Sequence, residues 1–377
     1  MASFVGKYRH SLTERKFSIK RHPNIFLILG KRGHVIAQAF NAVGLTCAYQ
    51  TRISGPRRLW GLLYEVAEQL GNRPSKYDYV LFDNLEYLPV AYAVSRILGI
   101  PLIARERGDG WSEVRQKEKT GGYRLPGARR IMDLYGAVLR RCVAVFCVSE
   151  YLKKQVKKNA QIMDRQLFNV PISVNTDAYA TSKNSKSDDR SAKSELTLLL
   201  VTNFRYPEKV KKIEEFMPAI AALLISNPDT RFLIAGDGPY LRIFKENIHP
   251  VLKGVSDRVI LKGYVHNIHQ LYRKADITFY LSGLDAFPRA LLESMAASCP
   301  VIANPFGGIP EIIQHGKNGF LVDSQEAFLY YAHKLIDDVT LRRAIGRTAR
   351  KHICQLYTPE QVGKKWLEAF AALDLKY

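Results

Sequence analysis

Residues 277–304 read ITFYLSGLDAFPRALLESMAASCPVIAN. The apolar runs at 277–281 and 300–303 predict two strands, and the amphipathic stretch 288–298 predicts a helix between them. Pro288 suits the first helical position, where the missing N–H of proline costs nothing. A strand, a helix and a second strand in this order indicate a parallel sheet covered by helices.

The same alternation continues in both directions along the chain. In the first half, it predicts strands at 24–29, 45–49, 77–82, 101–104, 143–148 and 167–170, and helices at 33–43, 57–70, 89–98, 126–140 and 150–158. In the second half, it predicts further strands at 196–201, 231–235 and 259–262, and helices at 210–225, 240–252 and 266–274.

The polar segment 181–195, TSKNSKSDDRSAKSE, divides the chain near its middle and has the composition of a linker. Near the C-terminus, Val362, Trp366 and Phe370 recur at helical spacing. We therefore predict two Rossmann-like, doubly wound α/β domains that face each other across a cleft, at 1–180 and 196–356. A C-terminal helix at 357–377 should pack back on the first domain. Ligands of such sheets bind beyond the carboxyl ends of the strands.

The composition is that of a globular protein, and the net charge is +21. This excess of positive charge favours binding to phosphates or to an anionic membrane surface. The alternative is a basic surface without a specific partner. The basic residues cluster in the first 22 positions and at Arg129-Arg130, Arg140-Arg141, Lys153-Lys154 and Lys157-Lys158. We find no nucleic-acid recognition motif, and no apolar run approaches the roughly 20 residues of a membrane span. Five cysteines without zinc-ligand spacing suit reduced thiols, so we expect a cytoplasmic protein, which could contact the inner membrane face peripherally.

Two carboxylates flank the start of the helix at 288–298. Asp285 lies in the preceding loop, and Glu293 lies in the second helical turn with small residues at three- and four-residue spacing. The free amides of a helix start bind anions, and a carboxylate can hold the two vicinal hydroxyls of a ribose. The alternative is an ordinary solvated glutamate on an amphipathic helix, which periodicity alone favours.

This segment resembles the signature of the retaining GT-B glycosyltransferases of family 4, the group 1 glycosyl transferases. Their pattern E-G-F-P-x-x-x-x-E-A-M-A, followed by G-x-P-V-I-A, stands here as D-A-F-P-R-A-L-L-E-S-M-A, followed by S-C-P-V-I-A. The resemblance implies that Glu293 binds the donor ribose and that Asp285 contacts the transferred sugar. It also implies that the amides of Ala286 and Phe287 help to hold sugar and diphosphate. Aspartate in place of glutamate at 285 is a departure from the pattern.

Further matches follow in the family's order. Residues 307–311 (GGIPE) resemble its G-G-x-P-E turn, and residues 315–322 (HGKNGFLV) resemble its d-G-x-N-G-x-L-V segment. Gly236 lies in AGDGP, which resembles V-G-D-G-P, and Tyr264 lies in LKGYV, which resembles the F-L-G-F-V strand end beside the base. Residues 174–177 (VNTD) resemble G-V-D-T. These matches cover nearly all of the second domain, which the resemblance makes the donor domain.

The family also has an arginine and a lysine after the first strand of that domain, as G-R-L-x-x-x-K-G. The corresponding residues 201–209 read VTNFRYPEK, so the usual arginine position holds Asn203. We expect Lys209, and Arg205 two residues beyond Asn203, to contact the diphosphate, because cations stabilise such a leaving group. The alternative is simply a basic helix start.

The first domain is less similar to the family. Gly33 lies in GKRGH after the first predicted strand, where a phosphate-binding turn would fall. Arg107 and Asp109 lie in RERGDGW after the fourth strand, where many members of the family have His-Gly near the reacting sugar. Arg107 is a candidate contact for sugar or phosphate, and Asp109 for sugar or acceptor. A plain turn is the alternative for this segment.

The resemblance implies a retaining transferase that moves a sugar from a nucleoside-diphosphate sugar to a glycan or lipid-linked acceptor, as in envelope polysaccharide or glycolipid synthesis. With no DxD-like motif, we expect no metal and no cofactor. Two other classes stay open. A sugar-nucleotide epimerase would need acid and base carboxylates in the first domain, for which Asp83 and Glu86 are candidates. A non-catalytic or partner-dependent nucleotide-sugar binder would account for the departures at Asp285, Asn203 and Arg107.

Overall fold

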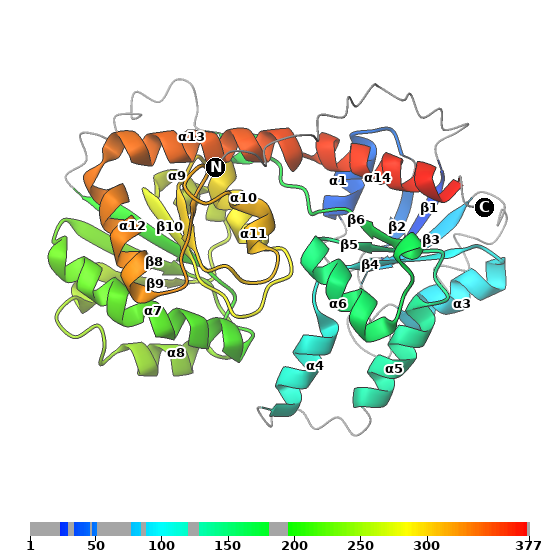
Figure 1. The fold of residues 1–377 in the computed structure, drawn as a ribbon, viewed down its shortest axis with the longest axis horizontal. Helices are drawn as coiled ribbons and strands as arrows, with labels where there is room; N and C mark the ends of the chain where they lie inside the picture. Colours follow the sequence, from blue (N-terminus) through cyan, green and yellow to red (C-terminus); the bar gives the residue numbers. More distant parts are fainter. Residues whose placement is uncertain are drawn as a thin grey trace, which may run out of the picture.

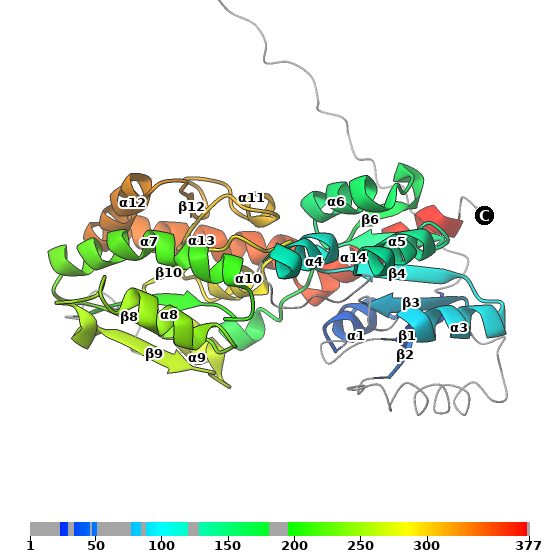
Figure 2. The ribbon, with the colours of Figure 1, turned by 90° about the horizontal axis from the view of Figure 1, so that it is seen from below.

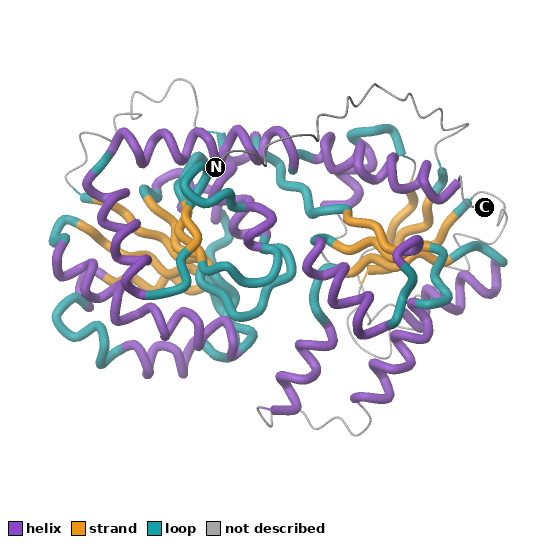
Figure 3. Tube along the Cα trace, viewed as in Figure 1, coloured by secondary structure: helices purple, strands orange, loops and turns teal. Residues whose placement is uncertain are grey.

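The computed structural model describes residues 23–28, 34–45, 47–50, 77–83, 88–119, 128–180 and 195–374. Within these ranges the chain forms two lobes, each built around a parallel sheet of six strands with helices on both faces (Figure 1 and Figure 3). This arrangement confirms the predicted pair of α/β domains. No helix of the described residues has the length and apolar character needed to cross a membrane.

The first sheet has the order β2-β1-β3-β4-β5-β6. Its strands are β1 (Ile25–Ile28), β2 (Cys47–Gln50), β3 (Tyr79–Asp83), β4 (Leu102–Glu106), β5 (Ala144–Cys147) and β6 (Leu167–Asn169). The chain places β2 on one side of β1 and β3 on the other, so the winding direction reverses between β1 and β3. All six strands lie where the alternation of apolar runs predicted them.

Helices cover both faces of the first sheet. They are α1 (His34–Asn41), α3 (Leu88–Leu98), α4 (Gly110–Lys119), α5 (Ala128–Leu139) and α6 (Glu150–Ala160). Helix α1 packs with Leu81 and Ile103 on one face, whereas α3, α5 and α6 share a core with Val80 and Phe82 on the other. The sequence pattern missed α4, because GWSEVRQKEK has no apolar periodicity and is anchored by Trp111. The helix predicted at 57–70 lies outside the described residues.

The second sheet has the order β12-β11-β10-β7-β8-β9. Its strands are β7 (Leu196–Val201), β8 (Thr230–Ala235), β9 (Val259–Gly263), β10 (Ile277–Tyr280), β11 (Val301–Ala303) and β12 (Phe320–Leu321). Its helices are α7 (Pro207–Ser226), α8 (Leu241–Ile248), α9 (Ile268–Lys274), α10 (Arg289–Ala296), α11 (Ile309–Ile312), α12 (Gln325–Asp337) and α13 (Val339–Leu356). Short 3₁₀ turns lie at Asp164–Gln166, Asp177–Tyr179 and Ser256–Arg258.

Several predicted boundaries shift in the second domain. Pro288 is the N-cap of α10, with an extended ψ of 116°, so the helix begins one residue later than predicted. Helix α9 begins at Ile268 rather than at 266, and α8 ends at Ile248 rather than at 252. The predictions named neither β12 nor any of α11, α12 and α13.

The last helix, α14 (Pro359–Asp374), leaves the second domain and packs against α1 of the first (Figure 1). The Trp366 ring is fully buried and lies 5.1 Å from the Phe40 ring and 4.5 Å from the Phe146 ring, measured between centroids. The predicted C-terminal helix is therefore confirmed, as is its packing on the first domain. Its apolar residues complete the core of that domain.

Candidate functional site

Four loops gather at the carboxyl edge of the second sheet, where parallel strands of such domains bind ligands. Two glycines hold the loop after β11 against the loop after β10. A Cβ atom on Gly307 would lie 1.8 Å from the carbonyl oxygen of Asp285, and one on Gly308 would lie 2.0 Å from that of Ala286. Gly307 also has a φ of +61°, which favours glycine. No other residue allows this approach, so the glycines fix the backbone around Asp285.

The loops after β7 and β8 are joined in the same way. A Cβ atom on Gly236 would lie 1.8 Å from the carbonyl oxygen of Thr202. The Gly236 amide donates to the carbonyl of Gly263 at the end of β9. The predicted turn at Gly236 therefore packs between its two neighbouring strand ends, and a larger residue would separate them.

Asp285 is the centre of a polar cluster. Its Oδ2 atom lies 2.7 Å from the ammonium of Lys209 and accepts hydrogen bonds from Tyr280 Oη at 2.6 Å and Ser282 Oγ at 2.8 Å. Lys209, in the first turn of α7, is buried. Burial raises the pKa of Tyr280, and the charge of Asp285 adds to this shift, which keeps that hydroxyl protonated as a donor. The structure thus brings the two predicted residues Asp285 and Lys209 together, and adds Tyr280 and Ser282.

Glu293 lies on α10 and is paired within its own helix. Its Oε1 atom lies 2.8 Å from Nε of Arg289, one turn earlier, and its side chain is 12% exposed. Burial raises the pKa of Tyr179, and the charge of Glu293 and a hydrogen bond to it add to this shift. Sequence reasoning expected small neighbours at Glu293 and missed Arg289 and Tyr179.

The remaining predicted donor residues lie in different surroundings. Ala286 and Phe287 are buried, and the Phe287 ring lies 5.6 Å from that of Tyr357 between centroids. Arg205 is exposed, and the Tyr264 side chain is 75% exposed. Within the described residues, neither of the latter two makes a hydrogen bond or an ion pair to the cluster around Asp285. Gly33 lies outside the described residues.

In the first domain, a second charged cluster lies at the ends of β3 and β4. Nε of Arg107 donates to Oδ1 of Asp83 at 2.7 Å. Arg105 is buried beside them, and burial lowers its pKa to about 10. Asp109 is buried at the start of α4, where its carboxylate accepts from the amide and the hydroxyl of Ser112. In this geometry Asp109 caps the helix, and Arg107 binds a neighbouring carboxylate.

The carboxyl group of Glu106 faces the opposite side of β4, where it accepts a hydrogen bond from Tyr135 Oη in a fully buried setting. Burial raises its pKa to about 7, with smaller contributions from the charges of Asp83 and Asp109. This carboxyl group is therefore partly protonated at neutral pH.

The two domains touch through Glu311 of the G-G-x-P-E turn. Its Oε2 and Oε1 atoms accept from the amides of Glu150 and Tyr151, each at 2.8 Å. These amides form the N-terminus of α6 in the first domain, and Figure 2 shows α11 facing α6 across the domain boundary. A carboxylate is favoured there because helix N-termini carry partial positive charge. On α4, Glu113 accepts from Tyr206 Oη at 3.1 Å and makes a second contact between the domains.

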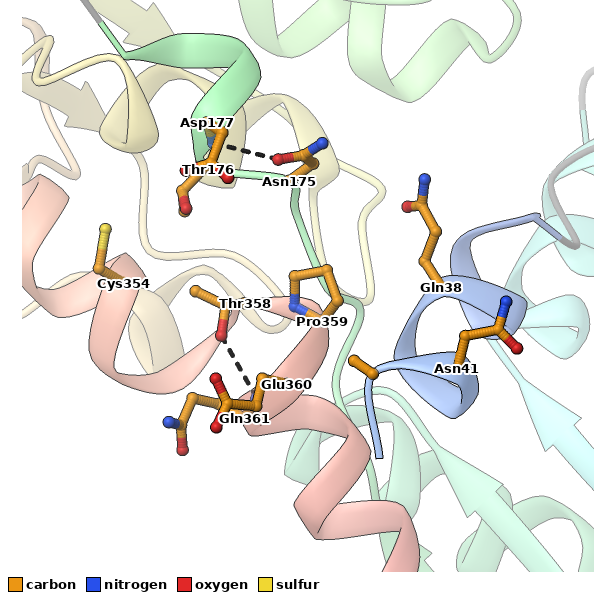
Figure 4. Close-up of a pocket in the computed structure, with 11 residues that line it drawn as sticks. Gln38, Asn41, Asn175, Thr176, Asp177, Cys354, Thr358, Pro359, Glu360 and Gln361 are labelled. Atoms are coloured by element: carbon orange, nitrogen blue, oxygen red, sulfur yellow. Dashed lines mark hydrogen bonds between the residues drawn. The ribbon is translucent and has the colours of Figure 1, made fainter. Parts of the chain in front are cut away.

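A separate pocket of about 690 Å³ opens where the chain crosses between the domains (Figure 4). The crossing segments are joined by a hydrogen bond from the Val174 amide to the Tyr357 carbonyl at 2.8 Å. The lining is polar and includes Gln38, Asn175 and Gln361. This pocket lies on the side of α1 and α14, and none of the predicted site residues lines it.

The second domain is similar in sequence to known proteins. Residues 183–352 match the family described as "Glycosyl transferases group 1". Over 177 residues, 45% of this chain, it is 33% identical to N-acetyl-alpha-D-glucosaminyl L-malate synthase of Bacillus anthracis. Over 270 residues it is 21% identical to alpha-D-kanosaminyltransferase of Streptomyces kanamyceticus, covering 68% of this chain and 67% of that enzyme. The match spans only 44% of the length of the Bacillus enzyme.

Solved structures give the same fold. Anabaena Alr3699/HepE in complex with UDP and glucose has a TM-score of 0.72 at 16% identity, covering 93% of this chain and 100% of that one. Sucrose-phosphate synthase from Thermosynechococcus elongatus has a TM-score of 0.68 at 15% identity, covering 94% and 100%. Residues 183–352 of this chain are thus similar to the glycosyl transferases group 1 family, and its two domains have the GT-B fold.

Proposed function

We propose that this chain is a glycosyltransferase of family 4 that moves a sugar from a nucleoside-diphosphate sugar to a glycan or lipid-linked acceptor with retention of configuration. The observation that carries the proposal is the cluster of Asp285 and Lys209 at the carboxyl edge of the second sheet, held by Gly307. The matched family is one of glycosyl transferases, and the HepE complexes with UDP and with UDP-glucose favour a UDP-sugar donor.

In the proposed mechanism, the second domain positions the donor and stabilises the leaving diphosphate. Lys209 and Arg205 supply positive charge to the phosphates. Asp285 contacts the transferred sugar, and the hydroxyls of Tyr280 and Ser282 orient the carboxylate of Asp285. Glu293 accepts the ribose hydroxyls. No side chain need act as a strong base, because a donor phosphate oxygen can take the proton of the acceptor hydroxyl. Catalysis then rests on positioning and charge stabilisation, and we propose that it needs no metal ion.

Nucleotide binding tests this proposal most directly. We would titrate UDP, GDP and ADP into the wild-type protein and into Glu293→Ala by calorimetry. Hydrogen bonds to a charged group contribute about 1.5–3 kcal/mol, so we expect the dissociation constant of the preferred nucleotide to rise roughly 10- to 100-fold in the variant.

A matched control is available on α8. The Arg242–Glu246 pair has the same i,i+4 geometry as Arg289–Glu293, with Nε and Oε1 2.9 Å apart, but lies on an exposed helix face. Glu246→Ala should bind the nucleotide as wild type does. If both variants behave alike, or if the folded wild type binds no nucleotide, the donor site is not where we propose. A wild type that binds UDP yet transfers no sugar to any acceptor would favour a non-catalytic binder.

A further inference from the structure

The charged cluster in the first domain has no role in donor binding as proposed above. Asp83 is the last residue of β3 and is paired in register with Arg105 of β4. Side chains alternate along a strand, so Arg105 lies on the same sheet face as Ile103, with α1 and α14, whereas Glu106 lies on the opposite face. Asp83, Arg105 and Arg107 therefore form one group at the carboxyl end of the first sheet.

The hydrogen bonds of this group are incomplete. Arg107 occupies Oδ1 of Asp83, but Oδ2 of Asp83 and Nε of Arg105 are buried and have no hydrogen-bond partner among the described residues. Arg105 is 3% exposed and Asp83 is 0% exposed. The guanidinium of Arg105 lies 5.7 Å from the centroid of the Trp366 ring, which offers a cation–π contact but no acceptor.

The charges of this group do not balance either. Two guanidinium groups face one carboxylate, which leaves one positive charge in excess within the group. Among the described residues, the nearby acids accept hydrogen bonds elsewhere, Asp109 from Ser112 and Glu106 from Tyr135 across the sheet. Burial of an uncompensated charge is costly, and buried polar atoms in native proteins nearly always have partners. The excess therefore points to a negatively charged ligand group.

The position of the group suits a ligand. The winding of the sheet reverses between β1 and β3, and open α/β sheets bind ligands in the crevice beyond such a reversal. Asp83 ends β3 at this crevice. Arg105 lies beside Asp83 on β4, the neighbour of β3 on the side away from β1. The loop after β4 also leads into α4, whose Glu113 contacts the second domain.

We propose that Arg105 binds an oxyanion of the acceptor, either a carboxylate or a phosphate group. The assignment of the ligand as the acceptor rests on the proposed function. Guanidinium groups present parallel N–H donors that match the two oxygens of such an anion. This makes an anionic acceptor the expected substrate class.

The test measures anion binding by calorimetry with succinate and with inorganic phosphate as probes, each with and without saturating UDP. Arg105→Gln should weaken binding of the preferred probe at least tenfold, with the affinity for UDP unchanged. Asp83→Asn should strengthen probe binding several-fold, because it removes the competing negative charge. If the cluster has only a structural role, Asp83→Asn should not strengthen probe binding. If Arg105→Gln does not fold, Asp83→Asn and Arg105→Lys test the proposal instead.

Lys209→Gln is the control for the donor site, and it should lower the affinity for UDP but leave UDP-saturated probe binding intact. Probe binding that is lost in Lys209→Gln and kept in Arg105→Gln would assign the anion to the donor diphosphate and overturn the proposal. So would weaker probe binding in Asp83→Asn, or no probe binding by the wild type. Failure of UDP binding alone, with Arg105-dependent probe binding preserved, would refute the proposed donor site but not the anion site.

Discussion

The two domains have the same kind of sheet but treat the charges at its carboxyl end differently. In the second domain, Asp285 accepts from three donors on a loop that Gly307 holds in contact with its neighbour, and Glu293 is paired with Arg289 on α10. In the first, Arg105 and Asp83 leave buried polar atoms without partners among the described residues. In the second domain, Asp285 and Glu293 each have a cationic partner within the protein, whereas the buried Nε of Arg105 in the first has no partner among the described residues. The following predictions test this contrast, from the largest expected effect to the smallest.

The largest effect is expected at the glycine contact of the second domain. Gly307→Ala would place a methyl group against the Asp285 carbonyl, at a φ of +61°. We expect it to lower the free energy of unfolding by about 2–5 kcal/mol, from backbone strain and overpacking together. Gly316→Ala is the matched control, because its φ is +75° but its Cβ would meet open space. Urea unfolding of both variants measures the difference, and equal losses would mean that the close approach to Asp285 contributes nothing.

In the first domain, we expect the buried carboxyl of Glu106 to make stability depend on pH. The folded protein holds this proton up to a pKa of about 7, whereas the ordinary value is 4.5. The contribution of Glu106 is therefore complete below pH 4.5 and is lost as the pH rises to 7, by roughly 3 kcal/mol at most. Glu106→Gln should remove this loss, so that the stability of the variant rises relative to that of the wild type between about pH 4.5 and 8.

Urea unfolding across that pH range measures the gain. Glu368→Gln, at an exposed glutamate of α14, should follow the wild-type profile. A Glu106→Gln profile parallel to that of wild type would show that the buried carboxyl titrates as an exposed one does.

The smallest effect is expected at the contact between the domains. Glu311→Gln keeps the shape of the side chain but removes the charge from the N-terminus of α6, which weakens the contact by about 1–2 kcal/mol. Hydrogen exchange at the amides of Glu150 and Tyr151 should then accelerate by roughly 5- to 30-fold. Glu326→Gln removes a carboxylate from the first turn of α12 within one domain, and should leave these two amides unchanged. Unchanged exchange in Glu311→Gln would mean that other contacts hold the domains together.

The sequence predicted every described strand except β12, because each of the others is a short apolar run between polar turns. The glycine turns at Gly236 and Gly307 were expected from the family resemblance. The sequence could not predict that Lys209 pairs with Asp285, or that Glu311 caps a helix 160 residues earlier in the chain. Such contacts depend on how loops and domains meet in space, which local periodicity does not encode. Helix α4 was not predicted, because its polar sequence has almost no apolar face. Arg105 directly follows a predicted strand, and only the structure reveals that its Nε is buried with no partner among the described residues.

The position of α14 has a consequence for synthesis on the ribosome. Trp366 completes the core around Phe40 and Phe146, yet it is translated long after either of them. At bacterial or eukaryotic elongation rates the delay is on the order of ten to sixty seconds. During that time one face of the first sheet is covered by α1 without α14, while all described strands of the second domain, which end at Leu321, are made. The described elements of the second domain are thus synthesised before the core of the first can be completed by α14.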